Sequence, residues 1–408
     1  MKSYNHLYEQ YISEDNYFLA VNNATQHKGG KKRKHEKAHY YRIHAVTLKD
    51  KLMNYAANFR NDPHQPKEIY DGVRRKKRLI YVPSMREQVV HHMVINVLKP
   101  IFMTPMYEHS YGSVPHRGAT KGSGNKKTQG GKECIEKFIR KNPKSCRYCL
   151  KMDIHKFFDS VPHDKLKAMF ARMIHDERFL QVLYTIVDAN GTEVGMPIGF
   201  YTSQWFANFY LTGLDHYIKE QLRAKGYFRY MDDMVIFGGN KRELHRMQQA
   251  VRRYLQEELG LEMNPKWQVF KFHYVDMNGK EHGRFLDFMG FRFYRNRTTL
   301  RKTLMLRATR KARRIARKKP KTCYDCKQML SYKGWITPTD TYGMYKKWIK
   351  PFVSFRYMRK FVGRVQRKQN QERKETQNVV QSKQWRHNQT SSAGYNQQQD
   401  LCLCPQGV

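Results

Sequence analysis

The tetrapeptide Tyr230-Met231-Asp232-Asp233 constrains the fold of this chain more than any other segment, because apolar residues flank it on both sides. Phe228 lies just before it, and Met234-Val235-Ile236-Phe237-Gly238 follows it. This pattern predicts two strands joined by a tight turn that carries both carboxylates. Adjacent carboxylates offer the oxygen ligands that Mg2+ prefers and shares with phosphates. A solvated Asp-Asp turn without a metal is the alternative.

A strongly basic balance surrounds this acidic pair. Of the 408 residues, 77 are Lys or Arg and 35 are Asp or Glu, which gives a net charge of +42. Such a field attracts polyanions, and nucleic acid is the leading class of partner, because phosphate neutralisation supplies most sequence-independent affinity. An anionic membrane surface is the alternative, but no stretch approaches about 18 apolar residues and no apolar signal core begins the chain. The sequence therefore predicts a soluble, intracellular protein of about two or three domains.

The seven cysteines include the C-x-x-C pairs Cys146-Cys149 and Cys323-Cys326, together with Cys402 and Cys404 near the C-terminus. Zinc sites use such pairs, but these pairs lie far apart and no compact cluster of further ligands accompanies them. Reduced structural thiols are the favoured interpretation, and a zinc site is the alternative.

Alternating strand-like and helix-like segments predict an α+β fold in which helices cover a sheet. A strand is expected over 78–82. Ser84 and Glu87 then form a capping-box signature, which begins a helix that stops near Pro100.

The second half of the chain continues the alternation. A short strand over 149–154 ends in an acid, and Asn240 begins a helix that Gly260 ends. From about residue 366 the chain is rich in Gln and Asn with few apolar residues, which predicts a disordered tail.

A two-metal centre for phosphoryl transfer needs a third carboxylate that faces the Asp pair from a neighbouring strand. Asp153 meets this need, because it ends the strand over 149–154 and precedes Phe157-Phe158. The segment 151–160, KMDIHKFFDS, together with the Asp-Asp turn resembles the palm of a reverse transcriptase. Further blocks resemble that family in the same order: RLIYVP at 78–83, SYGS at 110–113 with Arg117-Gly118, LGLEMNPK at 259–266 and FLDFMGF at 285–291.

The resemblance spans about residues 70 to 295 and implies a right-hand polymerase of class α+β. Such a polymerase has fingers, a palm with an antiparallel sheet and packed helices, and here a helical, basic thumb. The implied domains are an N-terminal helical basic extension at 1–62, fingers at 63–150, a palm at 151–295 with part of the fingers at 160–192, a thumb at 296–365 and a disordered tail at 366–408.

By this resemblance, Asp153, Asp232 and Asp233 are the catalytic residues. The implied metal set is Asp153, Ile154, Asp232 and Asp233, and the cofactor is two Mg2+ ions. One ion activates the primer 3′-hydroxyl, while the other binds the nucleoside triphosphate and eases the departure of pyrophosphate.

The implied nucleotide-binding set is Arg78, Lys77, Phe158, Ile198, Gly199, Gln204 and Lys266. Arg78 is expected to clamp the triphosphate, Phe158 matches the family's steric gate against a ribose 2′-hydroxyl, and Lys266 is a candidate to protonate pyrophosphate. The alternatives are a solvated basic face for 74–78, a core aromatic for Phe158 and a surface lysine for Lys266.

The segment 196–204, MPIGFYTSQ, indicates the subclass. Most reverse transcriptases carry Gln-Gly-x-x-x-Ser-Pro here, whereas this chain has Ile198 in place of the Gln and Gln204 in place of the Pro. This variant resembles reverse transcriptases of diversity-generating retroelements. Because Ile has no side-chain hydrogen bond to offer, we expect a loosely held nucleotide and misincorporation opposite template adenines. A neutral apolar replacement is the alternative.

The region after residue 296 is helical and basic, and eleven of the 21 residues in 301–321 are Lys or Arg. As a thumb it is expected to follow the sugar-phosphate backbone of the template-primer duplex, with a basic solvated surface as the alternative. Tyr342, Tyr345 and Trp348 are expected in its core. The implied nucleic-acid-binding set is Arg301, Arg307, Arg310, Lys311, Arg313, Arg314 and Arg317.

The resemblance implies an RNA-directed DNA polymerase that copies a template-repeat RNA into adenine-mutagenised cDNA. The implied partners are template RNA, the RNA–cDNA duplex, dNTPs and a small basic pentameric accessory protein, with no membrane. The implied setting is the cytoplasm of a bacterium, with the gene bacterial or phage-encoded. A group II intron or retron reverse transcriptase is one alternative, and an RNA-binding protein with a decayed polymerase fold is another.

Overall fold

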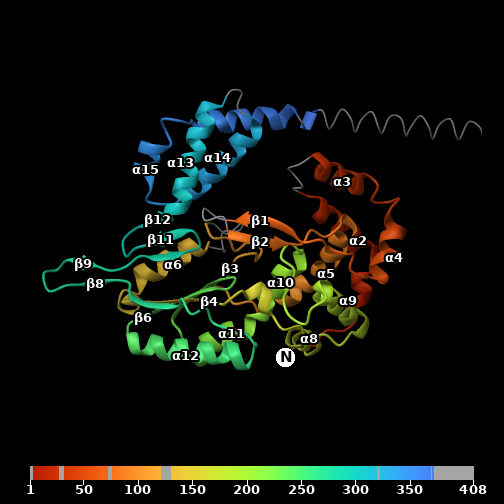
Figure 1. Ribbon diagram of the computed structural model, residues 1–408, viewed down its shortest axis with the longest axis horizontal. Coiled ribbons are helices and arrows are strands. Elements are labelled where there is room, and N and C mark those ends of the chain that lie inside the picture. Colours follow the sequence, from red (N-terminus) through yellow and green to blue (C-terminus); the bar gives the residue numbers. More distant parts are fainter. Residues whose placement is uncertain are drawn as a thin grey trace, which may run out of the picture. The chain divides into compact units, whose positions relative to one another are not determined.

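The computed structural model describes residues 3–26, 32–71, 76–120, 130–318, 322–368 and 370–371 (Figure 1). The chain divides into two compact units, Met1–Arg301 and Lys302–Val408. The mixture of helices and sheets confirms the predicted α+β class. Residues 372–408, which include most of the predicted disordered tail and both Cys402 and Cys404, lie outside the described residues.

A five-stranded sheet forms the centre of the first unit, in the order β3-β5-β6-β4-β7. Neighbouring strands run antiparallel except β3 and β5, which are parallel. The strands are β3 Ser110–Tyr111, β4 Tyr148–Asp153, β5 Gly226–Tyr230, β6 Asp233–Gly238 and β7 Gln268–Lys271. The central residues of β5 and β6 are buried, because helices cover the sheet on both faces.

Helices α6 (Gly131–Lys141) and α12 (Lys241–Glu257) pack on opposite faces of this sheet. On α6, the Phe138 ring lies 5.8 Å from the ring of Phe237. On α12, Leu244 lies against Gly238, the next residue along β6, which points to the other face. The Asn240 side chain accepts a hydrogen bond from the α12 backbone, which confirms the predicted start of that helix.

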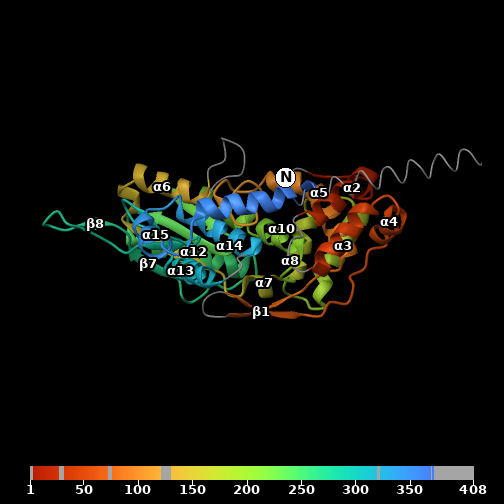
Figure 2. The ribbon, with the colours of Figure 1, turned by 90° about the horizontal axis from the view of Figure 1, so that it is seen from above.

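Helix α5 (Met85–Met103) contacts α1, α2, α3, α4 and α10 (Figure 2). The predicted capping box of Ser84 and Glu87 is confirmed. The predicted stop near Pro100 is wrong, because Ile101 and Phe102 beyond it are buried and their packing stabilises one more turn.

The remaining helical segments of the first unit are short. Their bounds are α1 Leu7–Tyr11, α2 Glu14–Thr25, α3 Lys32–Ile43, α4 Lys49–Ala57, α7 Phe157–Ser160, α8 His163–Ala171, α9 Glu177–Val187, α10 Tyr201–Tyr210 and α11 Thr212–His216, with 3-10 turns at Lys144–Cys146 and Asp188–Asn190 and a π-helical turn at Tyr217–Gln221. None of the helices in the described ranges combines the length and the apolar character that a bilayer crossing requires.

Three small sheets complete the first unit. Strands β1 (Lys67–Asp71) and β2 (Lys76–Ile80) pair antiparallel, so the expected strand over 78–82 begins and ends two residues earlier. Strands β8 (Tyr274–Val275) and β9 (Glu281–His282) form a hairpin. Strands β10 (Leu286–Phe288), β11 (Phe291–Phe293) and β12 (Thr298–Leu300) form an antiparallel sheet, and β10 and the start of β11 lie in the FLDFMGF block at 285–291.

The second unit contains α13 (Lys302–Arg317), α14 (Cys323–Ile336), α15 (Tyr342–Trp348) and a helix over 355–368. Its buried side chains come mainly from α13 and α14 and from residues after α15. The expectation of a core built from Tyr342, Tyr345 and Trp348 is wrong, because α15 has no buried residue. The Trp348 ring instead faces a basic side chain, the Arg313 guanidinium at 5.5 Å, and the Tyr345 ring stacks on Phe355 at 5.4 Å.

The thiols in the described part of the chain are free. Cys146 and Cys149 are both buried, and burial raises the pKa of Cys146 to about 12. A thiol of this kind stays protonated at neutral pH, which supports the structural interpretation of this pair.

Candidate active site

Three predicted catalytic acids lie at one end of the central sheet. In the antiparallel register of β4 and β6, Asp153 is paired with Asp233. Strands β5 and β6 form a hairpin that Tyr230 and Asp233 close, so Met231 and Asp232 make a two-residue turn. Met231 has φ 54°, the left-handed conformation that tight hairpin turns use at this position. The hairpin places Asp232 and Asp233 beside the end of β4, as the sequence predicted.

The charge of Asp233 is unfavourable in this setting. Burial is the main reason that its pKa is raised to about 6, and the charges of Asp232 and Asp153 raise it further. Lys151 offsets part of this effect from β4, where its Nζ lies 3.5 Å from an Asp233 carboxylate oxygen. Crowded carboxylates of this kind need a cation to be stable in the ionised form.

Asn264 fixes the orientation of Asp153. Its side-chain amide donates a 2.8 Å hydrogen bond to Asp153 Oδ2, and its backbone N–H donates to the Asp153 carbonyl at 2.8 Å. The preceding residue, Met263, forms a backbone bridge with Ile154, whose side chain is buried in the core. Only the backbone carbonyl of Ile154 is therefore available as a ligand. Sequence reasoning assigned Asn264 no role; its position in the LGLEMNPK block was the only signal.

The donor types at this end of the sheet fit Mg2+. Among the described residues, no three His, Cys, Asp or Glu side chains converge closely enough to form a closed metal cage. A closed cage is not what Mg2+ requires, because the ion keeps several waters and is held by one or two carboxylates plus substrate phosphates. Asp153, Asp232 and Asp233 supply such carboxylates on a rigid hairpin and its neighbouring strand.

A cavity of about 220 Å³ lies beside Asp153, on the β7 side of β4. Three cationic side chains line it, Lys151, Lys266 and Arg284. The structure thus places Lys266, a predicted nucleotide-binding residue, in the same cavity as Asp153. Asp153 and Asp287 are the acids of this lining, and the three cations beside them are suited to phosphate groups that a metal ion brings in.

The residues predicted to line the nucleotide pocket come together through backbone contacts. The Tyr81 N–H donates a 2.7 Å hydrogen bond to the Ile198 carbonyl, so the end of the β2 segment lies against the MPIGFYTSQ loop. Gly199 has φ 119°, and a Cβ there would lie 2.1 Å from the Tyr81 carbonyl oxygen. Met196 donates to the Phe158 carbonyl at 2.6 Å, which attaches α7 to the same loop.

The side chains of this set differ in exposure. Phe158 and Ile198 are half-buried, whereas Arg78 on β2 and Gln204 on α10 are exposed. Lys77 Nζ lies 2.5 Å from Glu68 Oε1 across the β1–β2 pair, so its charge is already partnered. Arg74 and Arg75 lie outside the described residues.

The predicted nucleic-acid-binding residues fall in both units. Arg301 ends the first unit, and its Nε lies 2.5 Å from Asp287 Oδ1. In the second unit, a cavity of about 510 Å³ is lined by Arg307, Arg310, Lys311, Arg314, Gln328, Ser331 and Tyr332. Arg313 and Arg317 are exposed on α13. Lys311 is buried and pairs with Asp325 at 3.1 Å, so its main contact is structural.

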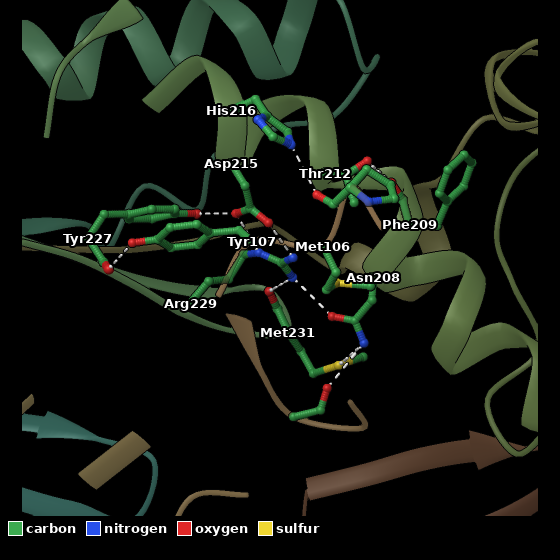
Figure 3. Close-up of polar contacts among 12 residues, drawn as sticks. Met106, Tyr107, Asn208, Phe209, Thr212, Asp215, His216, Tyr227, Arg229 and Met231 are labelled. Atoms are coloured by element: carbon green, nitrogen blue, oxygen red, sulfur yellow. Dashed lines mark hydrogen bonds and ion pairs between the residues drawn. The ribbon is translucent and has the colours of Figure 1, made fainter. Parts of the chain in front are cut away.

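Sequence reasoning also missed a buried polar network behind the Asp-Asp turn. Arg229 on β5 is fully buried and pairs with Asp215 on α11 (Figure 3). In the sequence, Arg229 is a single charge between aromatic residues of a strand, which gives no sign of its partner.

The chain is similar to several known proteins. A family model described as "Reverse transcriptase (RNA-dependent DNA polymerase)" matches residues 64–293. The chain is 30% identical over 165 residues to an uncharacterised 91 kDa protein in the cob intron of Schizosaccharomyces pombe, covering 38% of this chain and 19% of that protein. It is 25% identical over 212 residues to the retron Ec73 reverse transcriptase of Escherichia coli, covering 48% and 61%. A structure of apo telomerase from Candida tropicalis matches with a TM-score of 0.41 and 13% identity, covering 63% and 60%. The chain thus spans less than two thirds of the length of these relatives.

Proposed function

The chain belongs to the reverse transcriptase family, and we propose that it is an RNA-directed DNA polymerase that extends a primer by two-metal nucleotidyl transfer. One observation carries this proposal. The β4–β6 register pairs Asp153 with Asp233, and Asp232 lies in the adjoining turn, all within the segment that the family model matches.

In the proposed mechanism, Asp153 and Asp232 would hold two Mg2+ ions, with Asp233 as a further acid. Bound Mg2+ supplies charge neutralisation for the attacking and leaving oxygens. Asn264 keeps the Asp153 carboxylate oriented through its 2.8 Å hydrogen bond. Lys266 lies in the cavity beside Asp153 and would donate a proton to the departing pyrophosphate.

The proposed nucleotide pocket is formed by three segments of the first unit. Arg78 on β2 would contact the triphosphate, with Lys77 beside it in a lesser role because of its pairing with Glu68. The Phe158 ring would exclude a ribose 2′-hydroxyl, and the Ile198–Gly199 backbone would form the wall against which the base and sugar lie. The contacts that join Tyr81 to Ile198 and Met196 to Phe158 support one pocket.

We further propose that the enzyme is of the diversity-generating retroelement type. Ile198 is half-buried at the wall of this pocket and offers no side-chain hydrogen bond, and exposed Gln204 stands in place of the Pro of the Gln-Gly-x-x-x-Ser-Pro pattern. The product would be adenine-mutagenised cDNA from a template-repeat RNA, and a small basic pentameric protein would be an accessory partner. The similarity to a retron reverse transcriptase favours the second candidate, a retron or group II intron type enzyme.

Primer extension on an RNA template with Mg2+ tests the polymerase proposal. Asp232→Asn is expected to lower the rate by at least about 1000-fold, because the variant loses a carboxylate at the centre of charge neutralisation. Asp50→Asn is the matched control, since the Asp50 side chain is 96% exposed on α4. If Asp232→Asn retains activity, the metal assignment is wrong. If the wild-type chain makes no DNA, the decayed RNA-binding alternative is favoured.

Sequencing of cDNA made on the RNA that flanks the gene tests the subclass. Errors concentrated opposite adenines support the retroelement type, and evenly distributed errors favour the retron or group II intron alternative. Ile198→Gln is expected to reduce the adenine errors by restoring a hydrogen-bonding side chain, whereas Ile198→Val is expected to leave them unchanged.

A further inference from the structure

Arg229 is an unusual residue for a central strand, because its charge is completely removed from water. It lies on β5, two residues before the Met231-Asp232 turn, and both it and Asp215 are 0% exposed. Its Nε and Nη2 donate to the two oxygens of Asp215 at 2.7 and 2.6 Å. The Tyr227 hydroxyl donates a third hydrogen bond to Asp215 at 2.7 Å. Asp215 therefore holds one edge of the guanidinium in a fixed plane.

The remaining nitrogen of Arg229 faces the turn. Its Nη1 donates to the Met231 carbonyl at 3.1 Å and to the Asn208 side-chain oxygen at 3.1 Å (Figure 3). The Met231 carbonyl belongs to the peptide that joins Met231 to Asp232. On the other side of Met231, its N–H donates to the Tyr111 carbonyl at 3.1 Å. Both peptides that flank Met231 are thus fixed by hydrogen bonds.

Asn208 ties the same turn to two other segments. It lies buried on α10, and its amide nitrogen donates to the Gly112 carbonyl at 3.1 Å and to the Gln204 carbonyl at 3.1 Å. The same nitrogen lies 3.3 Å from the Met231 sulfur. Helix α10 directly follows the Ile198–Gly199 segment of the proposed nucleotide pocket, so the network connects that pocket with the acidic turn.

Stability alone does not account for this arrangement. A buried ion pair loses so much hydration that a well-packed apolar pair of similar volume is often as stable or more stable. What an apolar pair does not supply is a donor aimed at the Met231 carbonyl. Lys does not replace Arg in this role either, because a point charge lacks the planar fork that binds one carboxylate and still serves two further acceptors.

We propose that Arg229 is a positioning residue for the metal-bearing turn, oriented by Asp215 and linked by Asn208 to α10. This inference rests on the proposed polymerase function, because it assigns Arg229 an effect on metal binding and on the chemical step. Loss of the Met231 contact frees the Met231–Asp232 peptide, so the Asp232 carboxylate is no longer held in one orientation.

Arg229→Lys tests the proposal, since it keeps the positive charge beside Asp215 and removes the fork. Four quantities are measured on the full chain: the melting temperature, kcat, the Mg2+ concentration for half-maximal rate, and Mn2+ affinity by electron paramagnetic resonance. We expect kcat to fall by about 100-fold, as for a small misplacement of a reacting group, and the metal requirement to rise several-fold. The KM for primer-template is expected to stay unchanged.

Tyr210→Phe is the matched control. The Tyr210 hydroxyl is buried and donates a 2.6 Å hydrogen bond to the Leu259 carbonyl, so this variant loses a buried hydrogen bond outside the Arg229 network. It is expected to lower the melting temperature and to leave the metal requirement unchanged. If Arg229→Lys behaves in the same way, Arg229 is merely structural and the proposal is overturned.

A second variant covers the case in which Arg229→Lys does not fold. Asp215→Leu combined with Arg229→Met replaces the ion pair by apolar side chains, and we expect it to fold with a raised metal requirement. Wild-type kcat and metal requirement in this double variant would overturn the proposal. Failure of the wild-type chain to make DNA would instead contradict the polymerase function, and the Mn2+ measurement would still test Arg229.

Discussion

At the residue scale, Asp233 links the electrostatics of the fold to the chemistry proposed for it. Its pKa, about 6, is raised mainly by burial and then by Asp232 and Asp153. An acid whose pKa is higher in the folded than in the unfolded state binds more protons when folded. Without metal, its contribution to stability therefore falls as the pH rises from about 4, the unfolded value, through 6.

Asp233→Asn should therefore raise the melting temperature of the metal-free protein at pH 8, because it removes a charge that is unfavourable there. The increase should vanish near pH 4, where the wild-type carboxyl is protonated. Mg2+ should raise the melting temperature of the wild type more than that of the variant. Thermal melts in EDTA and in Mg2+ measure both effects, with Asp50→Asn as control. Equal Mg2+ shifts in the wild type and in Asp233→Asn would exclude Asp233 from the metal set.

At the element scale, local signals predicted more than long-range ones. The Ser84–Glu87 capping box, the Asn240 cap and the hairpin at Tyr230–Asp233 depend on residues close together in sequence, and the structure contains all three. The role of Arg229 depends on Asp215, 14 residues earlier on another element, and a charged strand residue by itself predicts an exposed edge.

One wrong expectation, for α15, and one unexpected burial, of Lys311, have the same physical origin. The aromatic residues of α15 match a core pattern, but α13 and α14 already bury each other's apolar faces, and Trp348 lies against Arg313 instead. Lys311, a predicted nucleic-acid-binding residue on a basic helix, is buried because Asp325 on α14 offers it a partner; its role at nucleic acid stays a prediction. In both cases the residues of the neighbouring helix determine whether the side chain is buried, and a single sequence does not show which residues those are.

The loop that carries Ile198 and Gly199 gives a prediction at this scale. A Cβ on Gly199 would lie 2.1 Å from the Tyr81 carbonyl, so Gly199→Ala must separate the loop from the β2 segment. We expect the KM for dNTP to rise by about tenfold or more, because the pocket wall shifts. Gly191→Ala is the matched control: Gly191 also has a positive φ, 67°, but nothing lies within 4 Å of its added Cβ. Steady-state kinetics and melting temperatures of both variants separate the pocket effect from backbone strain. If Gly199→Ala and Gly191→Ala have the same KM for dNTP, the assigned pocket is contradicted.

At the scale of the whole molecule, the net charge of +42 attracts nucleic acid without indicating where it binds. The sequence predicted a basic thumb after residue 296, and the chain divides after Arg301 into two units, the second of which holds the Arg-lined cavity. The wider assignment of extension, fingers, palm and thumb remains a prediction. In a general electrostatic field, cationic side chains of equal charge contribute about equally to nucleic-acid affinity. On a defined binding face, the side chains that contact phosphates contribute more than the others.

Changing Arg307, Arg310 and Arg314 together to Gln should therefore reduce both the affinity for an RNA–DNA duplex and its dependence on salt. Each lost phosphate contact lowers the slope of log affinity against log salt by about 0.7 to 0.9, so the triple variant should lose about 2 to 3. The control changes Arg242, Arg246 and Arg253 to Gln; these arginines are exposed on α12, and the net charge falls by the same amount. Fluorescence anisotropy at several salt concentrations measures both slopes. If the two triple variants have equal slopes of log affinity against log salt, the general field accounts for binding and the second unit has no special face. If the slope decreases more in the α13 variant than in the α12 control, the duplex is assigned to the face formed by Arg307, Arg310 and Arg314.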